Sequence, residues 1–181
     1  MKLTLYSSLI IFILGISISF AQEINQVNFN HLPQNKQLYG RDSDNHSNVI
    51  FDGSVQKSEY SYISVIKYRN KQRTGYLKQN LTYGNSKTAS FNLSTKIKAE
   101  LASYDFDVYL CKSKNDSSLI VSRKDIVSGD FYVIYGQSNA VAWEVDYTYR
   151  NDFCRTYGAT GVWALSNSQS PRVGIFGIEF Q

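Results

Sequence analysis

Between residues 49 and 128 the chain alternates apolar and polar side chains. In the run 89–98, apolar or threonine side chains occupy every second position, and the run 104–110 repeats the pattern. Such period-two alternation is typical of strands that bury one face and expose the other, as in an antiparallel sheet. Turn-forming pairs such as Asp52-Gly53 and Gly84-Asn85 separate the runs. We therefore expect a small, immunoglobulin-like β-sandwich over residues 49–128.

The pattern changes after Gly129. The run Phe131–Tyr135 is continuously apolar, which favours a strand buried on both faces, as in a parallel sheet. The run breaks at Gly136, and Ala140–Glu144 has the composition of a helix. Strand, turn and helix in this order predict the opening βα unit of an α/β domain over residues 129–181.

Two segments precede the sandwich. Lys2, the apolar run 9–20 and the small residues at Ser19 and Ala21 form the layout of a secretory signal peptide over residues 1–21. The apolar run is shorter than the roughly 20 residues that span a bilayer. Residues 22–48 are polar and rich in asparagine and glutamine, which predicts a linker or loosely laid arm. We expect a secreted or periplasmic protein with no membrane partner after cleavage.

Charge and cysteine content narrow the function classes. The formal net charge is +4, and the basic residues are scattered among asparagine, serine and tyrosine. No basic stripe is present, so a nucleic-acid partner is not expected. Cys111 and Cys154 are too few for a disulfide framework. We expect two free, partly buried thiols, with a bridge between them as the alternative.

Metal and cofactor signals are weak. Asp42, Asp44 and Asn45 form a small acidic loop, but the full ligand spacing of a calcium site is absent. A turn is the favoured interpretation, and no metal or cofactor is predicted.

Aromatic residues leave two interpretations open. Trp143 and Trp163 are expected to pack against a sheet rather than to stack on sugar rings. Several tyrosines of the sandwich fit either a glycan-binding face or the ordinary preference of tyrosine for strands, and we favour strand preference. They are Tyr60, Tyr62, Tyr68, Tyr76, Tyr83, Tyr104 and Tyr109.

Ser138 is the candidate nucleophile, because it follows the apolar run in Gly136-Gln137-Ser138-Asn139. A serine hydroxyl needs a base within hydrogen-bond reach and donors for the oxyanion that follows attack. A strand-to-helix turn provides such donors, since the amides at a helix start point toward the serine oxygen. The nucleophile elbow of α/β-hydrolases does not fit, because it requires glycine where this chain has Ala140.

Residues 125–140 resemble the first block of the sialate O-acetylesterase-type branch of the SGNH hydrolases. In that family a glycine-aspartate pair, an apolar strand and Gly-Gln-Ser-Asn follow in this order, as do Gly129-Asp130 and residues 131–139 here. The runs 153–158 and 173–179 resemble the next strand and helix start. The resemblance implies a three-layer α/β domain, truncated here, and an O-acetylated carbohydrate as substrate. It also implies Ser138 as acyl nucleophile and oxyanion donor, with Gly136, Gln137 and Asn139 in the supporting turn.

The family also implies a glycine and a Gln or Asn from later blocks, and a C-terminal Asp-x-x-His base. The two histidines, His31 and His46, lie in the polar arm and are expected to be solvated. Loss of a general base typically costs about 10²–10⁴ in rate. We therefore expect residues 129–181 to be the N-terminal fragment of the esterase domain, inactive as it stands. The alternative is a non-catalytic, secreted β-sandwich that binds glycan or protein, in which Ser138 is an ordinary turn serine.

Overall fold

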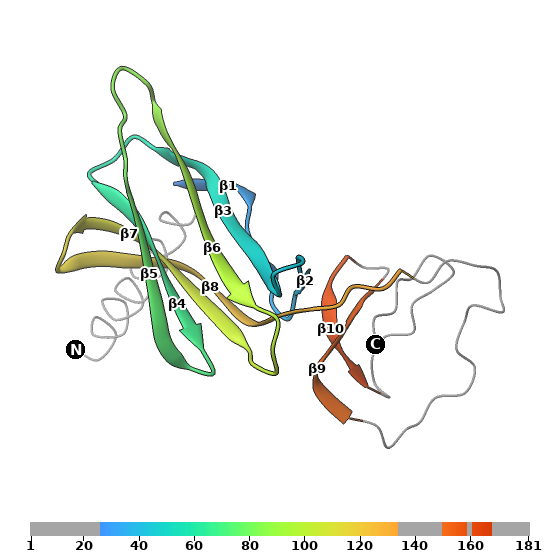
Figure 1. The fold of residues 1–181 in the computed structure, drawn as a ribbon. Helices are drawn as coiled ribbons and strands as arrows, with labels where there is room; N and C mark the ends of the chain where they lie inside the picture. Colours follow the sequence, from blue (N-terminus) through green and yellow to red (C-terminus); the bar gives the residue numbers. More distant parts are fainter. Residues whose placement is uncertain (1–25, 134–149, 159–160, 168–181) are drawn as a thin grey trace, which may run out of the picture.

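Ten β-strands make up the regular secondary structure of residues 26–133, 150–158 and 161–167, which this computed structural model describes (Figure 1). They are β1 (Val27–His31), β2 (Leu38–Gly40), β3 (His46–Gln56), β4 (Tyr62–Arg69), β5 (Gln72–Asn80), β6 (Thr88–Lys98), β7 (Tyr104–Ser113), β8 (Asp116–Gly129), β9 (Arg150–Tyr157) and β10 (Trp163–Asn167). No helix occurs within these ranges. The predicted signal peptide lies outside them. The described chain is therefore all-β.

Two sheets form the body of the structure. One has the strand order β1-β3-β6, and the other has the order β2-β8-β7-β4-β5. Neighbouring strands are antiparallel, except that β2 runs parallel to β8. Side chains from both sheets meet in one buried cluster. This arrangement is consistent with the β-sandwich predicted for residues 49–128.

The core between the sheets is filled by the alternate residues that the sequence pattern marks as apolar. Phe51 on β3 and Phe106 on β7 are completely buried, and their ring centroids lie 5.2 Å apart. Phe91, Leu93 and Ile97 on β6 are buried between exposed neighbours. Burial of one such side chain stabilises the fold by about 1.5–3 kcal/mol. The alternation thus accounts for the inner face of each of these strands.

The segment 22–48, expected to be a loose polar arm, belongs to the sheets where the structure describes it. β1 pairs with β3, and Phe29 packs edge-on against Phe91 with ring centroids 5.7 Å apart. β2 pairs with the end of β8, and β3 already begins at His46. The expectation is wrong because a few apolar residues spaced among asparagines are enough to give a short strand a buried face.

Gly53 permits β1 to lie close to β3. A Cβ atom at Gly53 would be 2.1 Å from the backbone oxygen of Asn28 and 2.9 Å from the Cα of Phe29. Any larger residue would therefore displace β1. The pair Asp52-Gly53, which the sequence pattern marks as a turn, lies inside β3, because this glycine serves close packing of two strands.

After Gly129 the described chain forms an antiparallel hairpin and not the expected βα unit. β9 pairs with β10, with Trp163 opposite Tyr157, and Gly161 at φ 76° lies in the connection between them. Residues 131–133 belong to no strand, and they are 47–61% exposed. The expected buried strand at Phe131–Tyr135 is wrong for these residues, because the described strands offer them no sheet partner. The expected helix at Ala140–Glu144 lies outside the described residues.

Candidate functional site

Ser138 and its neighbours Gly136, Gln137 and Asn139 lie outside the described residues. The nucleophile and its supporting turn therefore stay predictions. The structure does describe the segment that leads to them, since β8 ends at Gly129 and the chain is placed as far as residue 133. The end of β8 is therefore the described part of the chain that lies nearest to Ser138 in the sequence.

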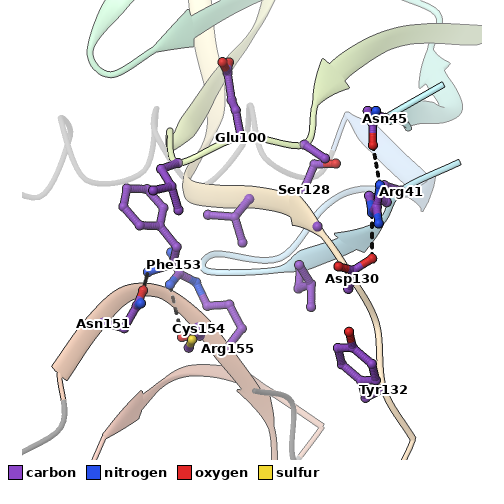
Figure 2. Close-up of a pocket in the computed structure, with 15 residues that line it drawn as sticks. Arg41, Asn45, Glu100, Ser128, Asp130, Tyr132, Asn151, Phe153, Cys154 and Arg155 are labelled. Atoms are coloured by element: carbon purple, nitrogen blue, oxygen red, sulfur yellow. Dashed lines mark hydrogen bonds and ion pairs between the residues drawn. The ribbon is translucent and has the colours of Figure 1, made fainter. Parts of the chain in front are cut away.

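A cavity of about 430 Å³ lies where the end of β8 meets the β9–β10 hairpin (Figure 2). It is surrounded by β2 and the loop after it, the connection from β6 to β7, the end of β8 and residues 151–155 of β9. Its walls combine apolar side chains such as Val127 and Phe153 with charged ones such as Arg41 and Asp130. Such a mixture is common in pockets that hold small polar ligands.

Arg41 fixes the chain where it leaves the sandwich. Its Nε donates a hydrogen bond of 2.6 Å to Asp130 Oδ1, and its Nη1 donates to the side-chain oxygen of Asn45 (Figure 2). The hydrogen bond to Asp130 raises the pKa of Arg41 further above its ordinary value. The backbone N–H of Arg41 also donates to the carbonyl of Gly129 at 2.9 Å. Arg41 thus holds the Gly129-Asp130 pair at the cavity rim by one side-chain and one backbone hydrogen bond.

Arg155 on β9 fastens the hairpin to β8. Its side chain is completely buried, and Nη2 donates to the carboxylate of Asp125 at 3.0 Å and to the carbonyl of Asp125 at 3.2 Å. Burial lowers the pKa of Arg155 and raises the pKa of Asp125, in each case against the opposing effect of the partner charge. Taking the Arg155 charge out of water offsets attraction to its partner, so the pair fixes the position of the hairpin more than it adds stability.

Asp125 is presented to Arg155 by an irregularity in β8. Its φ of 62° lies in the left-handed region, and the pairing of β7 with β8 shifts register between Tyr104 and Phe106, opposite this point. The backbone N–H of Asp125 donates to Asp105 Oδ1 at 2.8 Å, which stabilises the unusual conformation. A bulge of this kind re-aims a side chain out of the regular alternation.

Glu100 lines the cavity, but its carboxylate is already engaged. It accepts hydrogen bonds from Arg69 Nε at 2.7 Å and from the hydroxyl of Tyr104 at 2.8 Å. These two contacts, the one to Arg69 first, lower the pKa of Glu100 to about 2. Glu100 is therefore a fixed negative charge and not a proton-transfer group near neutral pH.

Neither histidine lines the cavity. His31 Nδ1 lies 2.6 Å from Asp52 Oδ1 on the surface, with 70% of the histidine side chain exposed. His46 Nδ1 lies 2.7 Å from the carbonyl oxygen of Asp44. The expectation that His31 is solvated is confirmed, and its pairing with Asp52 is a contact that the sequence did not predict.

The expectations for the thiols and for the acidic loop are confirmed. Cys111 is buried and Cys154 is half-buried, and no disulfide bond joins them. Asp42 Oδ1 accepts hydrogen bonds from the backbone N–H groups of Asp44 at 2.9 Å and His46 at 2.8 Å, which is a turn stabilised by its own carboxylate. Within the described ranges, no group of three or more His, Cys, Asp or Glu residues is arranged to hold a metal ion. In the same ranges, no helix has the length and apolar character to cross a membrane.

The tyrosines of the sandwich divide into two groups. Tyr60 and Tyr104 are buried in the core, and Tyr83 packs against it. Ile63 and Val65 of β4 point into the core, so the alternate residues of β4 and the residues paired with them point outward. The outward tyrosines are Tyr62, Tyr68, Tyr76 and Tyr109. We call this outer surface of β4, β5 and β7 the tyrosine face.

Trp163 belongs to the junction. Its ring lies 5.1 Å from the ring of Tyr157, and both pack against Leu38 and Val127. This confirms for Trp163 the expectation of sheet packing. Trp143 lies outside the described residues.

No protein-family model matches this chain, and no curated protein matches it.

Proposed function

We propose that the chain is part of a secreted serine esterase of the carbohydrate O-acetylesterase type, with Ser138 as its acyl nucleophile. The observation that carries the proposal is the order of Gly129-Asp130, a short apolar run and Gly136-Gln137-Ser138-Asn139. The fixed position of Gly129 and Asp130 beside a cavity supports it, because this segment leads directly to Ser138. The proposal rests on that block and not on an α/β architecture.

In the proposed reaction the Ser138 hydroxyl oxygen attacks the carbonyl carbon of an acetyl ester on a sugar. The serine proton passes to a histidine base and then to the departing sugar hydroxyl, which leaves an acetyl-serine. Water, deprotonated by the same base, releases acetate and restores Ser138. Neither His31 nor His46 stands in the Asp-x-x-His block that the resemblance implies for the base, so the proposal assigns the base to neither of them. We therefore expect the 181-residue chain alone to hydrolyse acetyl esters no faster than background.

A fluorophosphonate probe tests the assignment, because it labels activated serines covalently. The complete product of the gene is expected to be labelled, and Ser138→Ala is expected to abolish labelling. Ser94→Ala is the matched control. Ser94 is exposed on β6, which belongs to the β1-β3-β6 sheet and not to the sheet that contains β8, so its loss should leave labelling intact. Absence of labelling in the folded complete protein would refute the esterase.

A second candidate function is a non-catalytic, secreted β-sandwich that binds glycan or protein. The tyrosine face is the observation that favours it, because four tyrosines gather there outside the central cluster and one of them, Tyr76, is 48% exposed. This function requires no nucleophile, and it predicts a folded complete protein that the probe does not label.

A further inference from the structure

The edge strand β5 presents two cations and an aromatic ring on the tyrosine face. Arg73 lies over the ring of Tyr76, with its guanidinium carbon 5.6 Å from the ring centroid. Lys78 Nζ lies 3.9 Å from the ring centroid of Tyr62 on β4. Tyr76 remains 48% exposed, so one part of its surface stays open to a ligand. Aromatic rings with neighbouring cations therefore follow one another along this edge.

The two cations are not neutralised by a neighbouring carboxylate. Residues 70–80 contain Lys71, Arg73 and Lys78 but no acidic residue. No ion pair of Arg73 or Lys78 with a carboxylate is found in the described part of the chain. The carboxylates on this face are Asp105 and Asp107 on β7, which β4 separates from β5. Asp105 accepts a hydrogen bond of 2.8 Å from the backbone N–H of Asp125, and Asp107 accepts one of 2.5 Å from the hydroxyl of Ser122. The β5 side of the face thus carries a net positive charge.

The tyrosine face rests on a packed layer. Ser64 and Cys111 point outward beneath the tyrosines and are each only 3% exposed. The hydroxyl of Tyr62 donates a hydrogen bond of 3.0 Å to the carbonyl of Ser113, which fixes that ring. A surface whose aromatic side chains are already ordered loses little conformational entropy when a ligand binds.

We propose that the tyrosine face binds an acidic glycan, with a sugar ring on Tyr76 and a sugar carboxylate between Arg73 and Lys78. Sugar rings present apolar C–H faces that suit aromatic side chains, and the unneutralised cations are complementary to the carboxylate. The site goes beyond the proposed esterase, because it lies on the sandwich and does not depend on Ser138.

Other occupants fit the face less well. A second copy pairing along the β5 edge would bring the cations of one copy, Arg73 and Lys78, close to those of the other, and like charges on an edge oppose such pairing. A protein partner needs about 800 Å² per side and apolar anchors in pockets. The large apolar side chains exposed on this face are Tyr76 and Leu119.

Titration calorimetry with defined oligosaccharides tests the proposal on the full chain. We expect sialyllactose and trigalacturonate to bind, and lactose and the methyl ester of trigalacturonate not to bind. Affinity for the acidic sugars should fall as salt rises, because exposed charges are screened. Tyr76→Ala should weaken binding about tenfold, and Arg73→Gln or Lys78→Gln about fivefold each.

Lys96→Gln is the matched control, because Lys96 is an exposed cation on β6, in the sheet that does not carry the tyrosine face. It should change the affinity less than about twofold. Equal binding of the acidic and neutral sugars would overturn the proposal in favour of a neutral-glycan site. No binding, or equal weakening by Lys96→Gln and Lys78→Gln, would also overturn it. Ser138→Ala should leave binding unchanged, so failure here and failure of the esterase are distinguishable.

Discussion

The two outer faces of the sandwich differ although their inner faces are alike. β6 and β7 both place mainly apolar residues at every second position, and both contribute side chains to the same core. The outward residues of β6 are small or polar, and we call this surface the polar face. They are Ser90, Asn92, Ser94, Lys96 and Lys98. A polar face is sufficient to keep a sheet soluble, so the tyrosines of the other sheet are a difference between the two faces that solubility does not require.

Truncation of a tyrosine should produce the largest difference in stability between the two faces. Tyr109 on β7 lies opposite Ser64 on β4 and Leu119 on β8. Tyr109→Ala should lower the free energy of unfolding by about 2–3 kcal/mol, because it removes half-buried aromatic surface from the packed layer. Ser94→Ala on the polar face should change it by less than about 0.5 kcal/mol. Urea denaturation measures both, and similar losses in the two variants would show that the faces are energetically equivalent.

A smaller loss of stability is expected from a mutation at the point where the edges of the two sheets meet. Gln79 on β5 donates from Nε2 to the carbonyl of Ser90 at 3.3 Å and accepts at Oε1 from the N–H of Asn92 at 2.8 Å. The side-chain amide thus acts as a short strand partner for β6. Gln79→Ala should cost about 1–2 kcal/mol, since two hydrogen bonds are lost. Asn80→Ala, one position along and pointing to the other side, is the control, and an equal cost there would exclude this role.

Sequence patterns predict the strands that are straight and miss those that are short or bulged. The runs 89–98 and 104–110 coincide closely with β6 and β7, because both strands bury one face without interruption. β8 is longer, but register shifts break its alternation, so periodicity does not reveal it. The apolar run beginning at Phe131 looks like a buried strand, yet burial depends on a partner that local sequence cannot supply.

The candidate sites depend on contacts between residues far apart in the chain. Arg155 and Asp125 are 30 residues apart, and the bulge that brings them together has no sequence signature. The tyrosines of the sandwich are visible in the sequence, but only strand register separates the core tyrosines from Tyr62 and Tyr76. Ser138 remains a prediction from its sequence block alone.

Alkaline pH should weaken the fold through the tyrosine face. The pKa of Tyr62 is raised to about 12. Burial of the hydroxyl is the main cause, and a hydrogen bond with Cys111 is the second. Unfolded tyrosine ionises near pH 10, so the folded protein binds more protons between these values. The stability that Tyr62 contributes is therefore fully present below about pH 10, and it is lost as pH rises toward about 12. Urea midpoints measured across this range should fall less steeply in Tyr62→Phe. An unchanged slope in Tyr62→Phe would remove Tyr62 from this effect.

Acid should cause the smallest loss of stability. It acts on Glu100, which lies in the connection from β6 to β7 that joins the polar-face sheet to the tyrosine-face sheet. The pKa of Glu100 is lowered to about 2, mainly by the hydrogen bond from Arg69, whereas an unfolded glutamate titrates near 4.3. The stability that this contact contributes is present above about pH 4.3 and is lost as pH falls toward about 2. The loss should be modest, because Arg69 is partly exposed and the pair is screened by solvent.

Urea midpoints between pH 6 and pH 2.5 measure this contribution of Glu100. Glu100→Gln should lower the midpoint at pH 6 and flatten its fall in acid, because no carboxylate remains to be protonated. Arg69→Gln should flatten it as well, since it removes the main cause of the low pKa while leaving the carboxylate in place. If Glu100→Gln loses stability in acid as steeply as the wild type, the acid sensitivity arises elsewhere. The link between the two sheets would then rest on the core and on Gln79 rather than on this ion pair.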